Sequence, residues 1–67
     1  MTSTLLPWQE RLVAEKVELD VKIQKLKEFL DSPKYKELAS QDKLLLAEQH
    51  HYMLSYTLVL EARIARF

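Results

Sequence analysis

The 67-residue sequence predicts an all-α protein, an antiparallel αα-hairpin of two long helices with a short helical turn between them, which assembles into an oligomeric helical bundle. Three observations carry this prediction. Apolar residues recur at spacings of three and four in both halves of the chain. Gly is absent, and Pro7 and Pro33 are the only two prolines, so few positions interrupt a helix. One domain over residues 1–67 is expected.

The first helix is expected over residues 7–30. Pro7 suits a first helical turn, where its missing N–H group would have no partner in any case. The apolar residues that follow share one side of the helix, which we call its seam: Leu12, Leu19, Ile23, Leu26 and Leu30. Lys16 occupies the seam position that this spacing leaves open.

The segment Asp31-Ser32-Pro33 should end this helix, because a residue before proline is disfavoured in the α conformation. A short helical turn is then expected over residues 33–39. Ser40 is predicted to cap the second long helix, which should run over residues 41–66.

The second helix has more apolar surface than one partner helix can cover. Leucine, tyrosine and valine side chains lie well outside its own seam, so a second chain is expected to cover them. We predict a dimer or a larger homo-oligomer. Its interface is predicted to contain the seam of the second helix: Leu46, His50, Met53, Thr57, Leu60 and Ile64. His50 and Thr57 would form a polar layer that fixes the register.

Composition restricts the class of protein. Ten basic residues balance ten acidic ones, so generic binding to nucleic-acid phosphates is not expected. The absence of Cys excludes disulfides and cysteine zinc sites. A secretory signal and a run of eighteen apolar residues are both missing, which predicts a cytoplasmic protein that does not enter a membrane.

No residue pattern indicates catalysis. The sequence has no glycine-rich phosphate loop and no nucleophile in a triad-like context, so we expect neither an enzyme nor a cofactor. A metal site is not expected either. Adjacent side chains on a helix point about 100° apart, so His50 and His51 do not readily share one ion.

Five residues are candidates for binding an anionic ligand with a planar ring: Arg11, Lys16, Tyr52, Tyr56 and Arg63. Guanidinium and ammonium groups bind phosphate, and tyrosine rings stack on bases. The commoner role of tyrosines beside a helix seam is packing, and most lysines on a helix belong to a solvated face. Both interpretations stay open on the sequence alone.

The chain also resembles a group of small helical proteins of bacteriophages and prophages. The residues that carry this resemblance are Glu15, Leu19, Lys22-Ile23, Lys25-Leu26, Phe29-Leu30, Tyr35, Leu38, Leu45, Gln49, Met53, Tyr56, Leu60 and Arg63-Ile64. The resemblance implies a phage accessory protein that acts by binding in the cytoplasm of a bacterial host. It could sequester a nucleotide immune signal between subunits, or dock on a host or phage protein and inhibit or adapt it.

Overall fold

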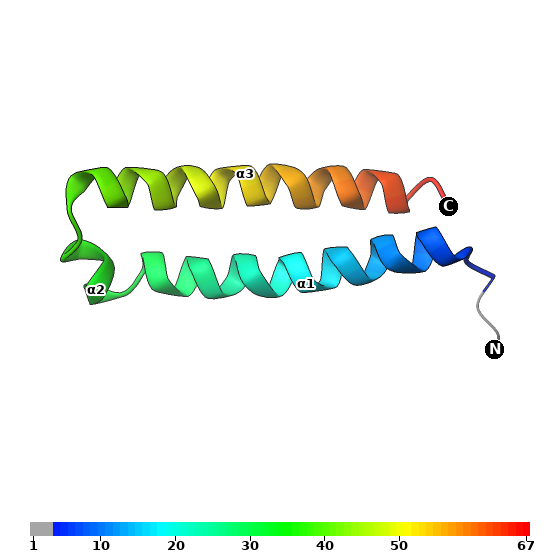
Figure 1. The fold of residues 1–67 in the computed structure, drawn as a ribbon, viewed down its shortest axis with the longest axis horizontal. Helices are drawn as coiled ribbons and strands as arrows, with labels where there is room; N and C mark the ends of the chain where they lie inside the picture. The colour runs from blue at the N-terminus through cyan, green and yellow to red at the C-terminus, as the bar shows by residue number, and fades with distance from the viewer. Residues whose placement is uncertain (1–3) are drawn as a thin grey trace.

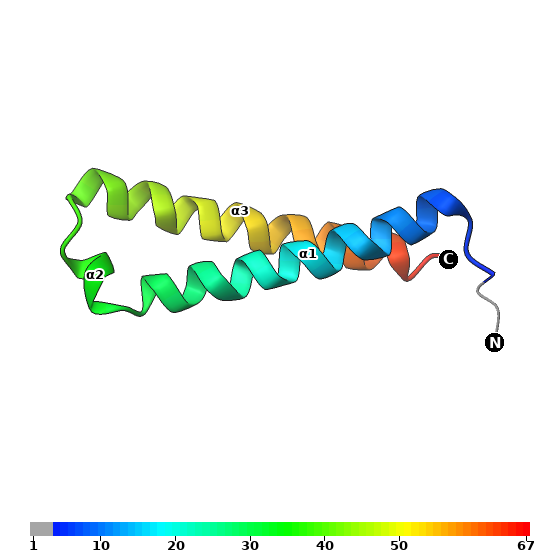
Figure 2. The same ribbon diagram turned by 60° about the horizontal axis from the view of Figure 1, so that its bottom comes forward.

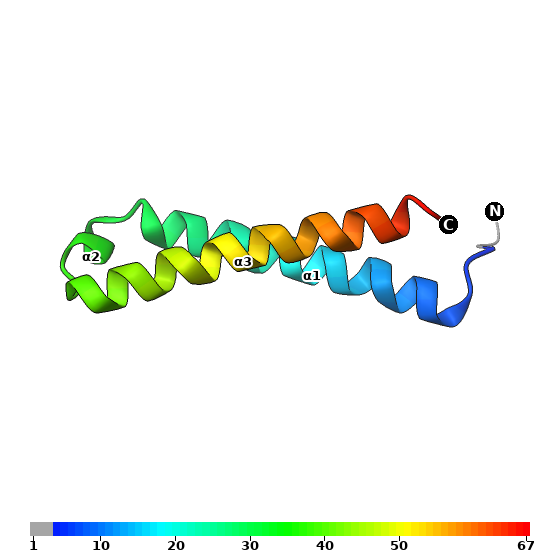
Figure 3. The ribbon, with the colours of Figure 1, turned by 90° about the horizontal axis from the view of Figure 1, so that it is seen from above.

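A computed structural model describes residues 4–67, in which three helices and no strands are found: α1 (Pro7–Leu30), α2 (Pro33–Lys36) and α3 (Ser40–Ile64). The helices α1 and α3 lie antiparallel, α2 closes one end, and the start of α1 and the end of α3 lie at the other end (Figure 1). Views from two further directions agree that the long helices run side by side and cross at a shallow angle (Figure 2 and Figure 3). The predicted all-α hairpin is confirmed.

Local hydrogen bonds set the two ends of α1. At its start the extended residue Leu6 donates its backbone N–H to the side-chain Oε1 of Gln9 at 2.7 Å. At its end the Ser32 hydroxyl donates to the carbonyl oxygen of Phe29 at 2.6 Å. Pro33 then begins α2 and cannot continue the α1 ladder, because it has no N–H group.

The helix α2 is shorter than the helical turn predicted over residues 33–39. The helix α2 ends at Lys36, before residue 39, because the N–H groups of Glu37 and Leu38 bond to carbonyls only three residues back. The Tyr35 hydroxyl donates to the carbonyl oxygen of Lys43 at 3.0 Å, which ties α2 to the first turn of α3. The prediction that Ser40 caps α3 is wrong. Ala39 is the N-cap residue, and Ser40 already lies in the helix.

The core of the hairpin is a single row of side chains between α1 and α3. In residues 4–67 only Leu12 and Leu60 are buried, with 5% and 0% of their surface exposed. The other seam residues are half-buried: Lys16, Leu19, Ile23, Leu26 and Leu30 on α1, and Leu46, His50, Met53, Thr57 and Ile64 on α3. The predicted interface residues therefore lie on the side of α3 that packs on α1. Their contact with a second chain stays a prediction.

The molecule is a thin rod rather than a globule. Its principal extents are 49 × 19 × 14 Å, and its radius of gyration is 15.5 Å. A compact chain of this length would have a radius of gyration of about 11 Å. Within residues 4–67 no helix is long and apolar enough to cross a membrane.

Candidate functional site

Two hydrogen bonds between α1 and α3 distinguish the two broad faces of the hairpin. The Tyr56 hydroxyl donates to Oε2 of Glu15, and the Thr57 hydroxyl donates to Oδ1 of Asp20 at 2.6 Å. Glu15 and Asp20 point about 140° apart on α1, because they are five residues apart. Tyr56 and Thr57 are adjacent and diverge by about 100° on α3. Each bond therefore marks a different side of the hairpin.

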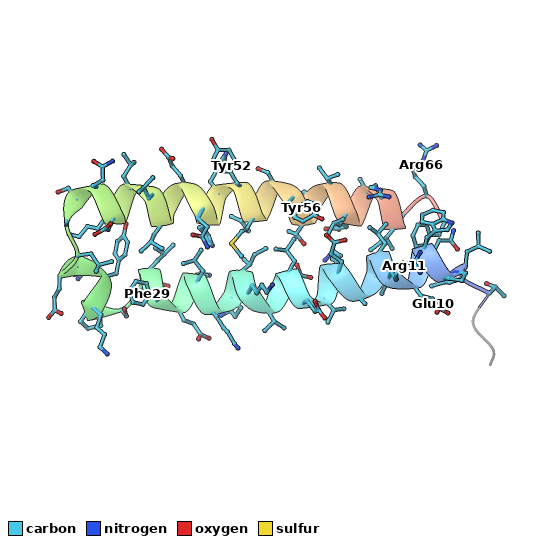
Figure 4. All side chains as sticks on the ribbon, viewed as in Figure 1. Glu10, Arg11, Phe29, Tyr52, Tyr56 and Arg66 are labelled. Carbon is cyan, nitrogen blue, oxygen red and sulfur yellow. The ribbon has the colours of Figure 1, made fainter. Side chains whose placement is uncertain are left out.

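The side marked by the Tyr56–Glu15 bond carries most of the predicted ligand residues, and we call it the tyrosine face: Arg11, Glu15, Tyr52, Tyr56 and Arg63. Tyr52 precedes Tyr56 by one turn and Arg63 follows it by two turns, so all three share one side of α3. Arg11 precedes Glu15 by one turn on α1. Figure 4 shows Tyr56 over the gap between the helices and Tyr52 farther out on α3. Tyr52 is 67% exposed.

The fifth predicted ligand residue, Lys16, is not part of this group. Its Nζ atom lies 2.7 Å from Oδ2 of Asp20, and the other carboxylate oxygen of Asp20 accepts the Thr57 hydroxyl. The hydrogen bond to Asp20 raises the pKa of Lys16. The bonds from Lys16 and then Thr57 lower the pKa of Asp20. The Lys16 ammonium is thus engaged by a charged partner at the edge of the seam, on the side away from the tyrosine face.

A pocket at the open end of the hairpin adjoins the tyrosine face, and we call it the end pocket: it is lined by Trp8, Gln9, Arg63, Arg66 and Phe67. Its volume is about 340 Å³. The rings of Trp8 and Phe67 meet edge to face, with their centroids 5.5 Å apart and their planes at 82°. Figure 4 shows Arg66 extending outward from the end of α3, away from α1.

The end pocket combines two kinds of binding group. An indole ring offers an apolar surface for a planar ring, and a guanidinium group donates paired hydrogen bonds to phosphate or carboxylate oxygens. Arg63 and Arg66 lie near the carboxyl end of α3, where positive charge also compensates the helix dipole. The arrangement therefore suits a ligand with a flat ring and a negative charge.

Among the residues that line the end pocket, Arg63 is the one that belongs to the five predicted ligand residues. Trp8 and Phe67 lie at opposite ends of the chain, and only the antiparallel register of α1 and α3 brings their rings together. No sequence pattern marks Gln9 as a ligand residue, and in the structure its side chain accepts the Leu6 N–H at the start of α1.

The histidines have separate environments. His50 lies in the seam, and its Nε2 atom is buried without a hydrogen-bond partner. The ring of His51 lies on the exposed side of α3, 5.6 Å from the ring of Tyr52. Among residues 4–67 there is no group of three or more His, Cys, Asp or Glu that could hold a metal ion.

Comparison with known proteins identifies a family model and a phage relative that match the chain. The family model described as Sequestin matches residues 6–66, which include both long helices and all of the end pocket except Phe67. The uncharacterized 7.5 kDa protein in the denB-rIIB intergenic region of Enterobacteria phage T4 is 38% identical over 63 residues, which cover 94% of this chain and 98% of that protein. No solved structure matches the chain. The predicted resemblance to small phage proteins is confirmed.

Proposed function

The chain belongs to the Sequestin family, and from this premise we propose that it is a non-enzymatic counter-defence protein, which works as a homo-oligomer in the bacterial cytoplasm and sequesters a nucleotide immune signal. The family name supports sequestration as the mode of action. The observation that carries the choice of ligand is the end pocket, where Trp8 and Phe67 lie beside Arg63 and Arg66.

The chemistry of a nucleotide matches the groups on this part of the surface. A base can stack on Trp8 or on an exposed tyrosine ring, and its phosphates can accept hydrogen bonds from the guanidinium of Arg63. The end pocket, at about 340 Å³, lies near the lower limit of roughly 300–1,000 Å³ for small-molecule sites. One hairpin therefore offers one wall of a nucleotide site, and the exposed tyrosine face offers space for the rest of the ligand.

The lining of the end pocket favours binding over catalysis. Its side chains are two guanidinium groups, one amide and two aromatic rings. None of these side chains is an imidazole, a carboxylic acid or a thiol, the groups that most often transfer protons or attack substrates in enzymes. A protein that only withholds its ligand needs affinity and a slow release rate, and such a lining supplies the contacts for both.

Thermal unfolding with a panel of cyclic and ADP-ribose-type nucleotides tests this proposal. A ligand at a hundred times its Kd stabilises the folded state by about 2.7 kcal/mol, which for a domain of this size raises Tm by about 10 °C or more. The variant Arg63→Glu should lose this shift. Lys34→Glu is the matched control, because it makes the same charge change at the turn end of the hairpin.

Recovery of the ligand separates sequestration from catalysis. After the complex is denatured by heat, chromatography should return the nucleotide chemically intact. A panel that produces no shift in Tm would overturn the proposed ligand class, and a cleaved nucleotide would overturn the non-enzymatic role.

A second candidate function is docking on a host or phage protein. The outer side of α3 favours it, because Leu44, Leu45 and Val59 are each more than half exposed. This function predicts a defined protein partner that is retained by Arg63→Glu and lost on Leu44→Glu, because Leu44 is exposed on a side of α3 away from Tyr52 and Arg63. Nucleotide sequestration predicts the opposite dependence for its ligand.

A further inference from the structure

The broad face opposite the tyrosine face is apolar on both long helices. Val17 is two residues after Glu15, and Leu58 is two residues after Tyr56, so each points about 160° away from its tyrosine-face neighbour. We call this surface the valine face, and it consists of Val13, Val17 and Val21 on α1 with Leu54 and Leu58 on α3. Val17 and Leu58 are 59% and 63% exposed.

The hairpin exposes more surface than a stable monomer of its size. Its accessible area is 5459 Å², whereas a compact monomer of 7.9 kDa exposes about 4,400 Å². The difference is on the order of 1,000 Å². A standard protein interface covers about 800 Å² on each partner. The broad side of the rod, 49 by 19 Å, is large enough to hold such an interface.

We propose that a second copy of this chain covers the valine face, with two hairpins packed face to face about a two-fold axis as a four-helix bundle. The proposal deepens the homo-oligomer of the proposed function, on which it rests, by assigning its contact surface. Two-fold packing brings the same patch of each copy together, so the patch must be able to bury itself. An uncharged row of valine and leucine side chains meets that condition.

The charges of the hairpin favour this face over the other one. Burying the tyrosine face would remove Arg11, Glu15 and Arg63 from water, which costs free energy unless each charge finds a partner. At the margin of the valine face lie Asp20, whose carboxylate is 2.7 Å from the Lys16 ammonium, and Glu61, which shares a side of α3 with Leu54 and Leu58 and also attracts Lys16. The five side chains of the valine face are themselves uncharged, so covering them leaves these marginal charges at a hydrated rim and costs less desolvation than burying the tyrosine face.

Mass in solution tests the assignment. Sedimentation or light scattering at micromolar concentration should give twice the 7.9 kDa chain mass for the natural sequence. Val17→Glu should give a monomeric or unfolded chain. Tyr52→Glu is the matched control, because it adds the same charge at a more exposed site on the tyrosine face and should leave the dimer intact.

A milder variant keeps the test decisive if Val17→Glu does not fold. Val17→Thr has nearly the same shape but buries a hydroxyl, and it enters a two-fold interface twice, so the dimer dissociation constant should rise about tenfold or more. A natural chain that is monomeric, a Val17→Thr dimer of unchanged affinity, or dissociation by Tyr52→Glu alone would overturn the assignment. Arg63→Glu separates the two proposals: it should abolish nucleotide binding while the dimer persists.

Discussion

Leu60→Ala is the sharpest test of how this thin hairpin is held together. Leu60 has 0% of its surface exposed and is the one fully buried side chain in residues 4–67. Replacing a buried leucine with alanine removes its transfer free energy and leaves a cavity, at a total cost of about 3–5 kcal/mol. A domain of this length has a total stability of only about 3–10 kcal/mol. The substitution therefore removes a large part of the stability.

Thermal unfolding followed by circular dichroism measures the effect. At roughly 4–8 °C per kcal/mol for a domain of this size, the smallest expected loss of about 3 kcal/mol lowers Tm by about 12–24 °C. Protein concentration is held constant, because dissociation of an oligomer also shifts Tm. Leu44→Ala is the control: Leu44 is 58% exposed on the same helix, and its loss should change the free energy of unfolding by less than about 0.5 kcal/mol. Equal decreases in Tm for the two variants would refute a core centred on Leu60.

Three further variants test polar contacts of the fold. Folding lowers the pKa of Asp20, so the carboxylate stabilises the fold above its unfolded-state pKa of about 3.9, and this stabilisation is lost as the pH falls through the folded-state pKa. Acid should therefore lower Tm more steeply for the natural chain than for Asp20→Asn. Parallel plots of Tm against pH would contradict this. Tyr35→Phe removes the hydrogen bond to Lys43 and should cost about 1 kcal/mol in a urea titration, whereas an unchanged midpoint would mean that this bond contributes nothing. His50→Leu removes a buried nitrogen that has no hydrogen-bond partner, so it should increase the free energy of unfolding by about 1 kcal/mol and raise Tm. A lower Tm would show that the imidazole makes a stabilising contact.

The fold was predictable because it depends on local signals. Spacings of three and four residues identify the seam of each long helix, and Pro33 fixes where the second half begins. The start of α3 was not predictable in the same way. Ser40 is a better capping residue than Ala39 by intrinsic preference, but the Lys43 N–H donates to the carbonyl oxygen of Ala39 at 3.0 Å, so the helix already begins at Ser40.

The candidate site was predictable only where helical periodicity determines it. Arg11 with Glu15, and Tyr52 with Tyr56 and Arg63, share sides of their helices through spacing alone. The same spacing places Lys16 in the seam and Asp20 one turn after it, whereas the Thr57–Asp20 bond across the hairpin depends on the register of the two helices. The end pocket depends on the register that joins Trp8 to Phe67. Neither contact is visible in the spacing within one helix, because both depend on the register between α1 and α3.

Self-association through one face and ligand binding on the opposite face limit how a second chain can enclose the ligand. If two copies pack through the valine face, both tyrosine faces point away from the two-fold axis, and each end pocket stays open to solvent. A nucleotide closed between subunits then requires the tyrosine faces of two dimers to meet, since no other surface brings Tyr52 and Arg63 of different chains together. Ligand binding would therefore double the mass of the dimer, and a saturated complex that remains a dimer would show that one hairpin's pocket holds the nucleotide without a lid from another chain.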